Sequence, residues 1–314
     1  MGNRTAVRIG ILGAIVAGGV LTLSVSASQQ PAEAPKTLEA EKIKDNLYML
    51  RNLPTSGGNT AVFITASGVT VVDTKNPGWG QPILDKIKTL TDKPIVRIIN
   101  THTHGDHVSG NVEFPATVDI VVQENTKANM EKMRPVTGLQ APPPGPSIFE
   151  KNSGKGLAKH VFKDTMTIGK GAEQIDLHYF GRAHTNGDAW VVFPALGVMH
   201  CGDAFHTRDL PIMDANNGGS GVNYSATLAK AAQVKGVSIL INGHNPTTTT
   251  IPDLIKHSEF LADFVKFVQD AKKNGKTIDD VVKTWKTPAK YEGYNAPQEA
   301  RVRSDAQVIW DETK

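Results

Sequence analysis

A segment of eight residues, 100–107 (Asn-Thr-His-Thr-His-Gly-Asp-His), concentrates side chains that bind metal ions. Three imidazoles and one carboxylate lie within six of its residues: His102, His104, Asp106 and His107. This donor density is typical of a metal site. His102 and His104 are two residues apart, so in an extended chain they point to the same side and can share one ion. Gly105 permits a tight turn that directs the last two donors toward a second ion.

Three further candidate ligands each follow an apolar run with a small residue nearby: His184 after residues 175–180, Asp203 after residues 198–200, and His244 after residues 239–242. Small residues are expected where the backbone approaches a metal closely. Taken singly, His and Asp at strand ends often cap helices, and residues 102–107 could cap a helix that begins near Ser109. Their occurrence together and in this order favours a metal centre.

This order of ligands resembles the metallo-β-lactamase-fold hydrolase superfamily, whose signature is His-x-His-x-Asp-His followed by a His, an Asp and a last His. The resemblance extends from about Lys44 through the C-terminal helices. It implies a four-layer αββα fold that holds two zinc ions. One ion would be bound by His102, His104 and His184, the other by Asp106, His107 and His244, with Asp203 bridging both. Asp73 matches an early aspartate of the family, which orients ligands by hydrogen bonding.

These ligands indicate a hydrolytic reaction. Neutral imidazoles and carboxylates suit zinc, which lowers the pKa of a bound water toward neutrality. The resulting hydroxide attacks a carbonyl or phosphoryl centre, and we expect Asp106 to orient it and to carry a proton to the leaving group. We therefore expect a zinc-dependent hydrolase that opens a small-molecule cyclic amide or ester, a β-lactam or a lactone.

The loop after Asp203 bears on the substrate. Related β-lactamases place a Lys three residues after this ligand, to bind the substrate carboxylate; here that position is His206, with Arg208 nearby. The segment that ends at Asn216 resembles a Gly-Asp-Ala-Asn segment of those enzymes, so we expect substrate contacts from His206, Arg208 and Asn216. The Arg that usually follows their motif aspartate is His107 here, which matches lactonases and glyoxalase-II-type thioesterases better.

The resemblance leaves other activities open. These are a thioesterase, phosphodiesterase or sulfatase on the same site, a mononuclear iron persulfide dioxygenase, and a zinc-binding module without turnover. Flavodiiron reductases have Glu where His104 stands, which disfavours them. All seven ligand-type residues are retained, which argues against loss of turnover.

The hydrophobic pattern predicts the elements that must position these residues. Apolar runs predict strands over residues 47–50, 60–65, 69–72, 95–99, 118–122, 165–168, 175–180, 189–193, 198–201 and 238–242. Helical spacing occurs over residues 82–90, 124–133, 223–234 and 254–271. The Pro/Gly-rich residues 134–156 predict a long surface loop without regular structure. Two β-rich halves with helices outside predict an α+β fold, a four-layer αββα sandwich.

Composition narrows the class of protein further. The 314 residues are 39% hydrophobic, as in a globular protein, and the single cysteine, Cys201, excludes an intramolecular disulfide. A formal charge of +3 without a Lys/Arg block argues against nucleic acid as a partner. We expect a secretory signal peptide over residues 1–27, a linker over 28–43 and the catalytic domain over 44–314. The protein would then be periplasmic or secreted, and would contact a membrane only through an uncleaved signal segment.

Overall fold

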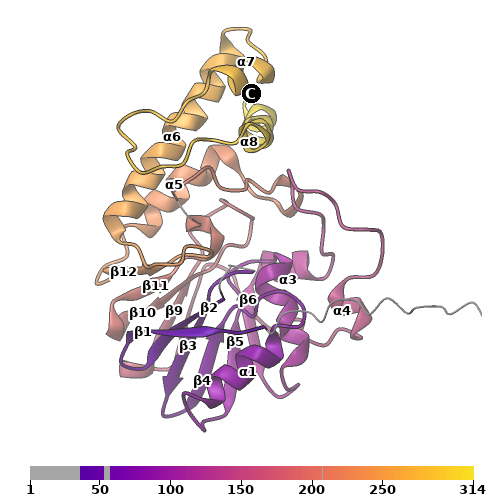
Figure 1. Cartoon of the computed structure of the whole chain (residues 1–314), viewed down its shortest axis with the longest axis vertical. Helices are drawn as coiled ribbons and strands as arrows, with labels where there is room; N and C mark the ends of the chain where they lie inside the picture. The colour runs from indigo at the N-terminus through magenta and orange to yellow at the C-terminus, as the bar shows by residue number, and fades with distance from the viewer. Residues whose placement is uncertain (1–35, 53–56, 207) are drawn as a thin grey trace, which may run out of the picture. The chain divides into compact units, whose positions relative to one another are not determined.

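Two β-sheets occupy the centre of the fold (Figure 1). The computed structural model describes residues 36–52, 57–206 and 208–314, and the chain from Lys36 to Lys314 is one compact unit. The predicted signal peptide therefore lies outside the described residues, as does the linker up to residue 35.

The first sheet has seven strands in sequence order: β1 (Glu39–Lys44), β2 (Leu47–Arg51), β3 (Thr60–Thr65), β4 (Gly68–Val72), β5 (Ile95–Ile99), β6 (Asp119–Gln123) and β7 (His160–Phe162). Neighbours from β1 to β4 are antiparallel, and those from β4 to β7 are parallel. The second sheet has the order β12 (Ile239–Ile241), β11 (Val198–His200), β10 (Trp190–Phe193), β9 (Ile175–His178) and β8 (Thr165–Ile168). In it β11 and β12 are parallel, and the other neighbours are antiparallel.

The sheets pack face to face around one apolar core. The rings of Phe63 on β3 and Phe193 on β10 lie 5.0 Å apart across this interface. Adjacent residues of a strand serve different cores, because side chains alternate between the faces of a sheet. Val72 thus belongs to the core between the sheets, whereas Val71 packs in the outer core with Ile83 of α1.

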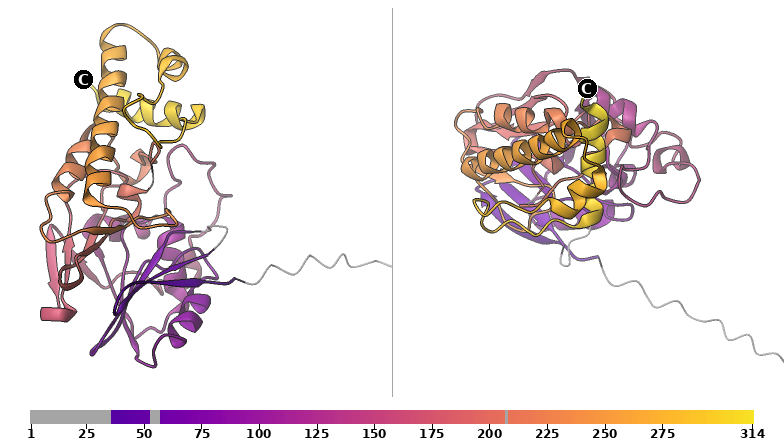
Figure 2. Two further views of the ribbon diagram at one scale, coloured as in Figure 1. Left: turned by 60° about the vertical axis from the view of Figure 1, so that its left-hand side comes forward. Right: turned by 90° about the horizontal axis from the view of Figure 1, so that it is seen from above.

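Helices cover both outer faces, so the predicted αββα sandwich is confirmed. The helices are α1 (Gly80–Lys88), α2 (Gly105–Val108), α3 (Glu124–Met130), α4 (Ile148–Lys151), α5 (Gly221–Ala231), α6 (Ile251–Lys273), α7 (Ile278–Thr284) and α8 (Glu299–Glu312). Figure 2 shows the long helix α6 beside α5, with α8 crossing near them. Leu228 of α5, Leu261 of α6 and Ile309 of α8 share an outer core with Trp190 of β10.

Two predictions of irregular structure are wrong. Residues 39–43 are not linker but part of β1, an edge strand whose polar sequence hides its pairing with β2. Arg51 on β2 forms ion pairs with Glu39 and Glu41 of this strand. The stretch 134–156 contains α4, whose first turn is fixed by a capping box between Ser147 and Glu150.

Among the described residues, none of the helices has the length and apolar character needed to cross a membrane.

Candidate metal centre

The seven candidate ligands come together where strands of both sheets end. His102 and His104 lie in the loop after β5, and α2, which follows directly, carries Asp106 and His107. The second sheet contributes the other three from segments after β9, β11 and β12: His184, Asp203 and His244. Loops at one edge of the sandwich therefore converge on one site, although the residues are far apart in sequence.

The first group comprises His102, His104, His184 and Asp203. One potential ligand atom from each lies within 4.8 Å of those of the other three, and all four residues are buried. Nε2 of His184 is 3.0 Å from Nδ1 of His104 and 3.8 Å from Oδ2 of Asp203. Nε2 of His102 is buried and has no hydrogen-bond partner among the described residues.

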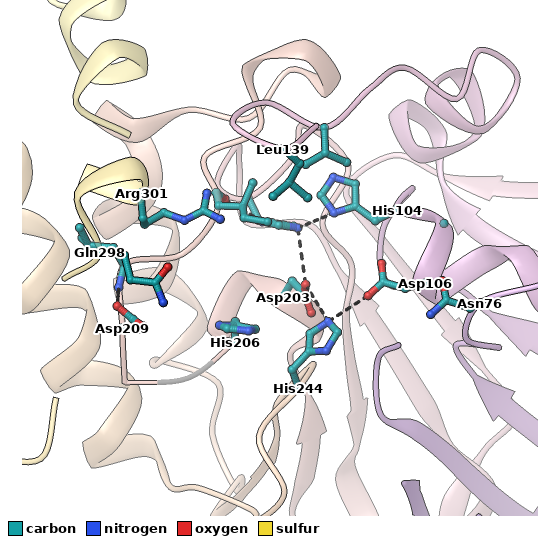
Figure 3. Close-up of a pocket in the computed structure, with 15 residues that line it drawn as sticks. Asn76, His104, Asp106, Leu139, Asp203, His206, Asp209, His244, Gln298 and Arg301 are labelled. Carbon is teal, nitrogen blue, oxygen red and sulfur yellow. Dashed lines mark hydrogen bonds and ion pairs between the residues drawn. The ribbon is translucent and has the colours of Figure 1, made fainter. Parts of the chain in front are cut away.

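The second group comprises Asp106, His107 and His244, whose ligand atoms also lie within 4.8 Å of one another. Nε2 of His244 is 3.2 Å from Oδ2 of Asp106 and 3.2 Å from Oδ2 of Asp203. Nε2 of His107 is 3.2 Å from Oδ1 of Asp203. The carboxylate of Asp203 thus faces both groups, the position expected of a bridging ligand (Figure 3).

Hydrogen bonds fix which nitrogen of His102 and of His107 faces the centre. Oδ2 of Asp73 is 2.7 Å from Nδ1 of His107, so the structure places this aspartate where the sequence suggested an orienting residue. Asp73 also accepts hydrogen bonds from the backbone N–H and hydroxyl of Thr101, whose Oγ1 is 3.0 Å from Nδ1 of His102. The backbone at Asp73 has a φ of 62°, a left-handed conformation that turns the chain after β4 toward the site.

Sequence reasoning noted Asp214 within the family-like segment that ends at Asn216, but it assigned neither Asp214 nor Ile212 a contact with a ligand. Oδ2 of Asp214 is 2.7 Å from Nε2 of His104, and the carbonyl of Ile212 accepts a hydrogen bond from Nδ1 of His184 at 2.7 Å. A buried lysine was missed as well: Nζ of Lys75 donates to the carbonyl of Gly58, and burial lowers its pKa to about 8. An aspartate ending an apolar run was a signal for Asp214; no signal marked Lys75.

Glycines beside the ligands permit this close packing. A Cβ at Gly243 would lie 1.8 Å from Oδ1 of Asp203, and one at Gly58 would lie 2.2 Å from the ring of His107. Both distances are far below van der Waals contact, so the small residues expected beside the ligands are required for packing.

Histidine pKa values shift in opposite directions in the two groups. Burial, followed by the nearby imidazoles, holds the pKa of His102 well below its ordinary value. Burial and the neighbouring His104 lower the pKa of His184 to about 3. In the second group burial would also lower the pKa of His244, but the carboxylates of Asp203 and Asp106 raise it to about 9. Burial opposes ionisation of Asp106, yet His107 and His244 hold its pKa below the usual range.

The arrangement suits bound cations. A buried imidazole nitrogen without a partner is costly, and a metal ion at that point would satisfy it. Five imidazoles with two ionised carboxylates are a donor set typical of zinc and other borderline divalent metals. The donor set of each group therefore fits a divalent metal ion.

A cavity of about 520 Å³ opens beside the two groups. His206 lines it, with its ring 5.2 Å from that of His244. Arg208 and Asn216 are not among the lining residues. Arg208 instead bonds Asp253 at 2.9 Å, and the exposed side chain of Asn216 bonds the carbonyl of Pro135. Their placement thus gives no support to the expected substrate contacts.

Several lining residues escaped the sequence prediction, and four of them reach the cavity from segments outside the ligand loops: Val136, Leu139, Gln298 and Arg301. The first two come from the Pro/Gly-rich stretch. The last two come from the start of α8, far along the chain from every ligand.

Comparison with known proteins gave one family and several relatives. The family described as "Metallo-beta-lactamase superfamily" matches residues 54–244. The chain is 26% identical over 192 residues to "Metallo-beta-lactamase type 2" of Elizabethkingia meningoseptica, across 57% of this chain and 67% of that protein. It is 28% identical over 169 residues to "Hydroxyacylglutathione hydrolase" of Synechococcus sp. (strain JA-3-3Ab), across 54% of this chain and only 52% of that protein.

A solved structure shows the same fold. The metallo-beta-lactamase from Pontibacter korlensis superposes with a TM-score of 0.57 at 18% identity, over 72% of this chain and 99% of that one.

Proposed function

The chain belongs to the metallo-beta-lactamase superfamily, and we propose that it is a di-zinc hydrolase that opens a cyclic amide or ester, a β-lactam or a lactone. The observation that carries the proposal is the convergence of seven ligand-type side chains from both sheets beside an open cavity. We also propose that the protein acts in the periplasm or outside the cell, as the N-terminal sequence suggests.

The proposed metal ions would be held by the two groups, with Asp203 shared between them. Bound there, zinc would supply a nucleophile from water at neutral pH and polarise the carbonyl oxygen of the substrate. Asp214 and the carbonyl of Ile212 hold two of the three imidazoles of the first group, those of His104 and His184, in the tautomer whose other nitrogen faces the centre. Asp73 does the same for His107.

We propose Asp106 as the residue that accepts the proton and passes it on. Its carboxylate lines the cavity, its side chain is 30% exposed, and its low pKa keeps it ionised. An ionised carboxylate at the cavity surface can accept a hydrogen bond that orients the attacking water. It can then pass the proton to the nitrogen or oxygen that leaves when the ring opens.

The test is hydrolysis of a chromogenic cephalosporin and of a chromogenic lactone by the zinc-loaded protein, with Asp203→Ala as the control. We expect the wild-type protein to hydrolyse one of the two substrates and to bind about two zinc ions per chain. The control should bind less zinc and show no turnover. Binding of zinc without turnover of either substrate would reject the proposal that the substrate is a cyclic amide or ester. Iron together with oxygen uptake would reject the hydrolase itself in favour of a dioxygenase.

A thioesterase is the second candidate, because the hydroxyacylglutathione hydrolase relative is 28% identical over half of this chain. Release of thiol from an acyl-glutathione thioester, measured on the same preparation, separates the two. A specificity constant for the thioester above those for lactam and lactone would establish it as the reaction. No turnover of any of these would favour a zinc-binding module.

A further inference from the structure

The Pro/Gly-rich stretch between α3 and α4 forms part of the cavity wall. Its residues 134–146, which we call the strap, belong to a long loop that rises toward α8 (Figure 1). Val136 and Leu139 of the strap line the cavity together with the metal-binding residue His104 (Figure 3). The strap therefore gives the cavity apolar surface close to the first metal-binding group.

Most of the strap has little to hold it in place. Residues 138–146 are exposed, and four of these nine residues are prolines, which have no N–H to donate. Gly138 allows a close approach to α8, because a Cβ there would lie 2.2 Å from Oγ of Ser304. The position of the apolar wall therefore depends on contacts at the N-terminal end of the strap.

Hydrogen bonds at that end join the strap to a segment from the second half of the chain. Oδ1 of Asp214 accepts from the backbone N–H of Thr137 at 3.0 Å and from the hydroxyl of Thr137 at 2.9 Å. The same hydroxyl oxygen accepts from the backbone N–H of Asn216 at 2.9 Å. The side chain of Asn216 donates to the carbonyl of Pro135 at 2.9 Å. Thr137 is central to this set, because it bonds both Asp214 and Asn216.

The carboxylate of Asp214 connects these bonds to the metal centre. It is fully buried, and its second oxygen, Oδ2, is 2.7 Å from Nε2 of His104. Nδ1 of the same ring faces the centre, 3.0 Å from Nε2 of His184. A carboxylate is planar and rigid, so one of its oxygens cannot move without the other. The orientation of His104 and the position of Thr137 therefore depend on the same group.

The two ends of this connection support each other. A buried carboxylate is favourable only when hydrogen bonds replace its hydration. If the strap moved away, Oδ1 would lose both donors of Thr137. Within the described residues, the donor left to it would be the backbone N–H of Asn217, at 3.4 Å. At the other end, a metal ion bound by His104 would make the imidazole a stronger donor to Oδ2 and would hold the carboxylate in place.

We propose that Thr137 is a positioning residue that couples the strap to the first metal-binding group through Asp214, so that a metal ion there and the apolar wall of the cavity stabilise each other. The wall is then complete only in the metal-loaded protein. This inference rests on the proposed metal centre and goes beyond the proposed hydrolase function, since it gives the metal a part in shaping the cavity. Such coupling is reciprocal: the strap strengthens metal binding by the factor by which the metal stabilises the strap.

The first test measures zinc affinity and needs no turnover. Thr137→Val removes the hydroxyl but keeps the size of the side chain and its backbone N–H. We expect it to weaken zinc binding about 3- to 10-fold at the first group and less than about twofold at the second, because Thr137 acts on a ligand through Asp214. Thr137→Ser keeps the hydroxyl and should bind zinc like the wild type. Competition with a chromogenic chelator would measure both groups.

Thr167→Val is the matched control. The hydroxyl of Thr167 on β8 also donates to an aspartate, Asp176, at 2.7 Å, and both residues lie outside the cavity. This variant should leave zinc affinity unchanged. Equal weakening of both groups in Thr137→Val would mean a general loss of stability and overturn the proposal. An unchanged affinity at the first group would overturn it as well.

A kinetic test separates the wall from the reaction centre. In the zinc-saturated protein, Thr137→Val should raise KM about 3- to 10-fold for whichever test substrate the wild type hydrolyses, and should leave kcat within about twofold. The reason is that the strap forms a wall and carries no reacting group. A fall in kcat at unchanged KM would contradict the proposal.

The closing test measures the reverse effect, by hydrogen exchange followed by nuclear magnetic resonance. Zinc should slow the exchange of the backbone N–H groups of Thr137 and Asn216 about 3- to 10-fold. The N–H of Glu173, which bonds the carbonyl of Lys170 in a turn outside the cavity, should be unaffected. In Thr137→Val the N–H of Asn216 loses its acceptor, so zinc should no longer slow its exchange.

The outcomes distinguish this inference from the proposed function. Zinc binding without slower exchange at Thr137 would overturn the coupling even if the enzyme hydrolyses lactones. Slower exchange in a protein that hydrolyses none of the test substrates would support the coupling and reject the hydrolase. A protein that binds no zinc would reject the metal centre and the coupling together.

Discussion

The two groups of metal-binding side chains differ in how firmly the protein holds them. In the first group all four residues are buried, and the segment 212–214 holds two of the three imidazoles. In the second group Asp106 and His244 are 30% and 22% exposed, and Asp73 holds His107. The motif 102–107 therefore contributes side chains both to the buried first group and to the more accessible second group. The accessible position is where substrate and water can approach.

The largest expected effect is on the accessible group. Asp106→Asn should lower kcat/KM about 10²- to 10⁴-fold for whichever test substrate the wild-type protein hydrolyses, because the amide cannot accept and pass on a proton. The fold should persist, since Asp106 contributes to no apolar core. Steady-state kinetics and circular dichroism would check this, with the exposed Asp85→Asn on α1 as control. Retention of more than a tenth of the activity would assign the proton to another group.

The orienting carboxylates allow the two groups to be weakened one at a time. Asp214→Asn should lower zinc affinity about 10- to 100-fold at the first group, and Asp73→Asn by a similar factor at the second. Each substitution keeps an acceptor near the imidazole but removes the charge. Titration with a competing chromogenic chelator would measure both sites. If either variant weakened both sites equally, the two groups would be one cooperative unit and the comparison would not hold.

Exposure predicts the order in which metal is lost. Rising chelator concentrations should remove ions in two steps, with dissociation constants at least about 10-fold apart, and the second group should empty first. Metal analysis and the absorption spectrum of the cobalt-substituted protein would follow the steps. Asp203→Asn alters the ligand that faces both groups, so it should bring the steps together. Loss of the first group's ion before the second's would contradict the difference in rigidity.

The last expected effect is on stability and reaches the first group through α8. Asp305 accepts from the backbone of Met213, the middle residue of the segment that holds His104 and His184. Burial raises the pKa of Asp305 from 3.8 to about 8. The folded state therefore keeps a proton that the unfolded chain loses near pH 4. The free energy of unfolding should thus fall between pH 4 and 8, by at most about 1.4 kcal/mol per pH unit.

Asp305→Asn should remove this pH dependence and keep an acceptor for the Met213 N–H. Urea unfolding at pH 5, 6, 7 and 8 would measure it, with Asp311→Asn on the exposed side of α8 as the control. Parallel pH profiles for Asp305→Asn and the wild type would show that Asp305 is ionised in the folded protein.

The sequence predicts those parts of the fold and site whose signal is local. The αββα class follows from two β-rich halves with helical stretches outside them. The candidate ligands stand out because few other roles need such side chains together. The strand β1 was missed because an edge strand with only Ala40 and Ile43 among charged residues has no strand-like alternation. The helix α4 was missed because four residues are too few for a period, and its capping box is a weak signal among prolines.

The rest of the site depends on tertiary packing. Asp214 lies 110 residues from His104 in sequence, and no local sequence pattern predicts a hydrogen bond between residues so far apart. Arg301 has the spacing of an ordinary surface residue on an amphipathic helix. Only the packing of α8 against α5, α6 and α7 brings its guanidinium to the cavity. Substrate recognition is therefore less predictable than metal ligation, because it depends on elements that carry no motif.

The metal centre draws on both halves of the chain: His104 is 80 residues from His184, and His107 is 137 residues from His244. An ion held at either group is therefore a cross-link that closes a long stretch of polypeptide. Such an ion binds the folded chain and finds no preformed site in the unfolded one. It would add roughly 4 kcal/mol to the free energy of unfolding at a free metal concentration 1,000 times its dissociation constant. When metal is scarce, proteases would then degrade the protein faster, in addition to the loss of its activity.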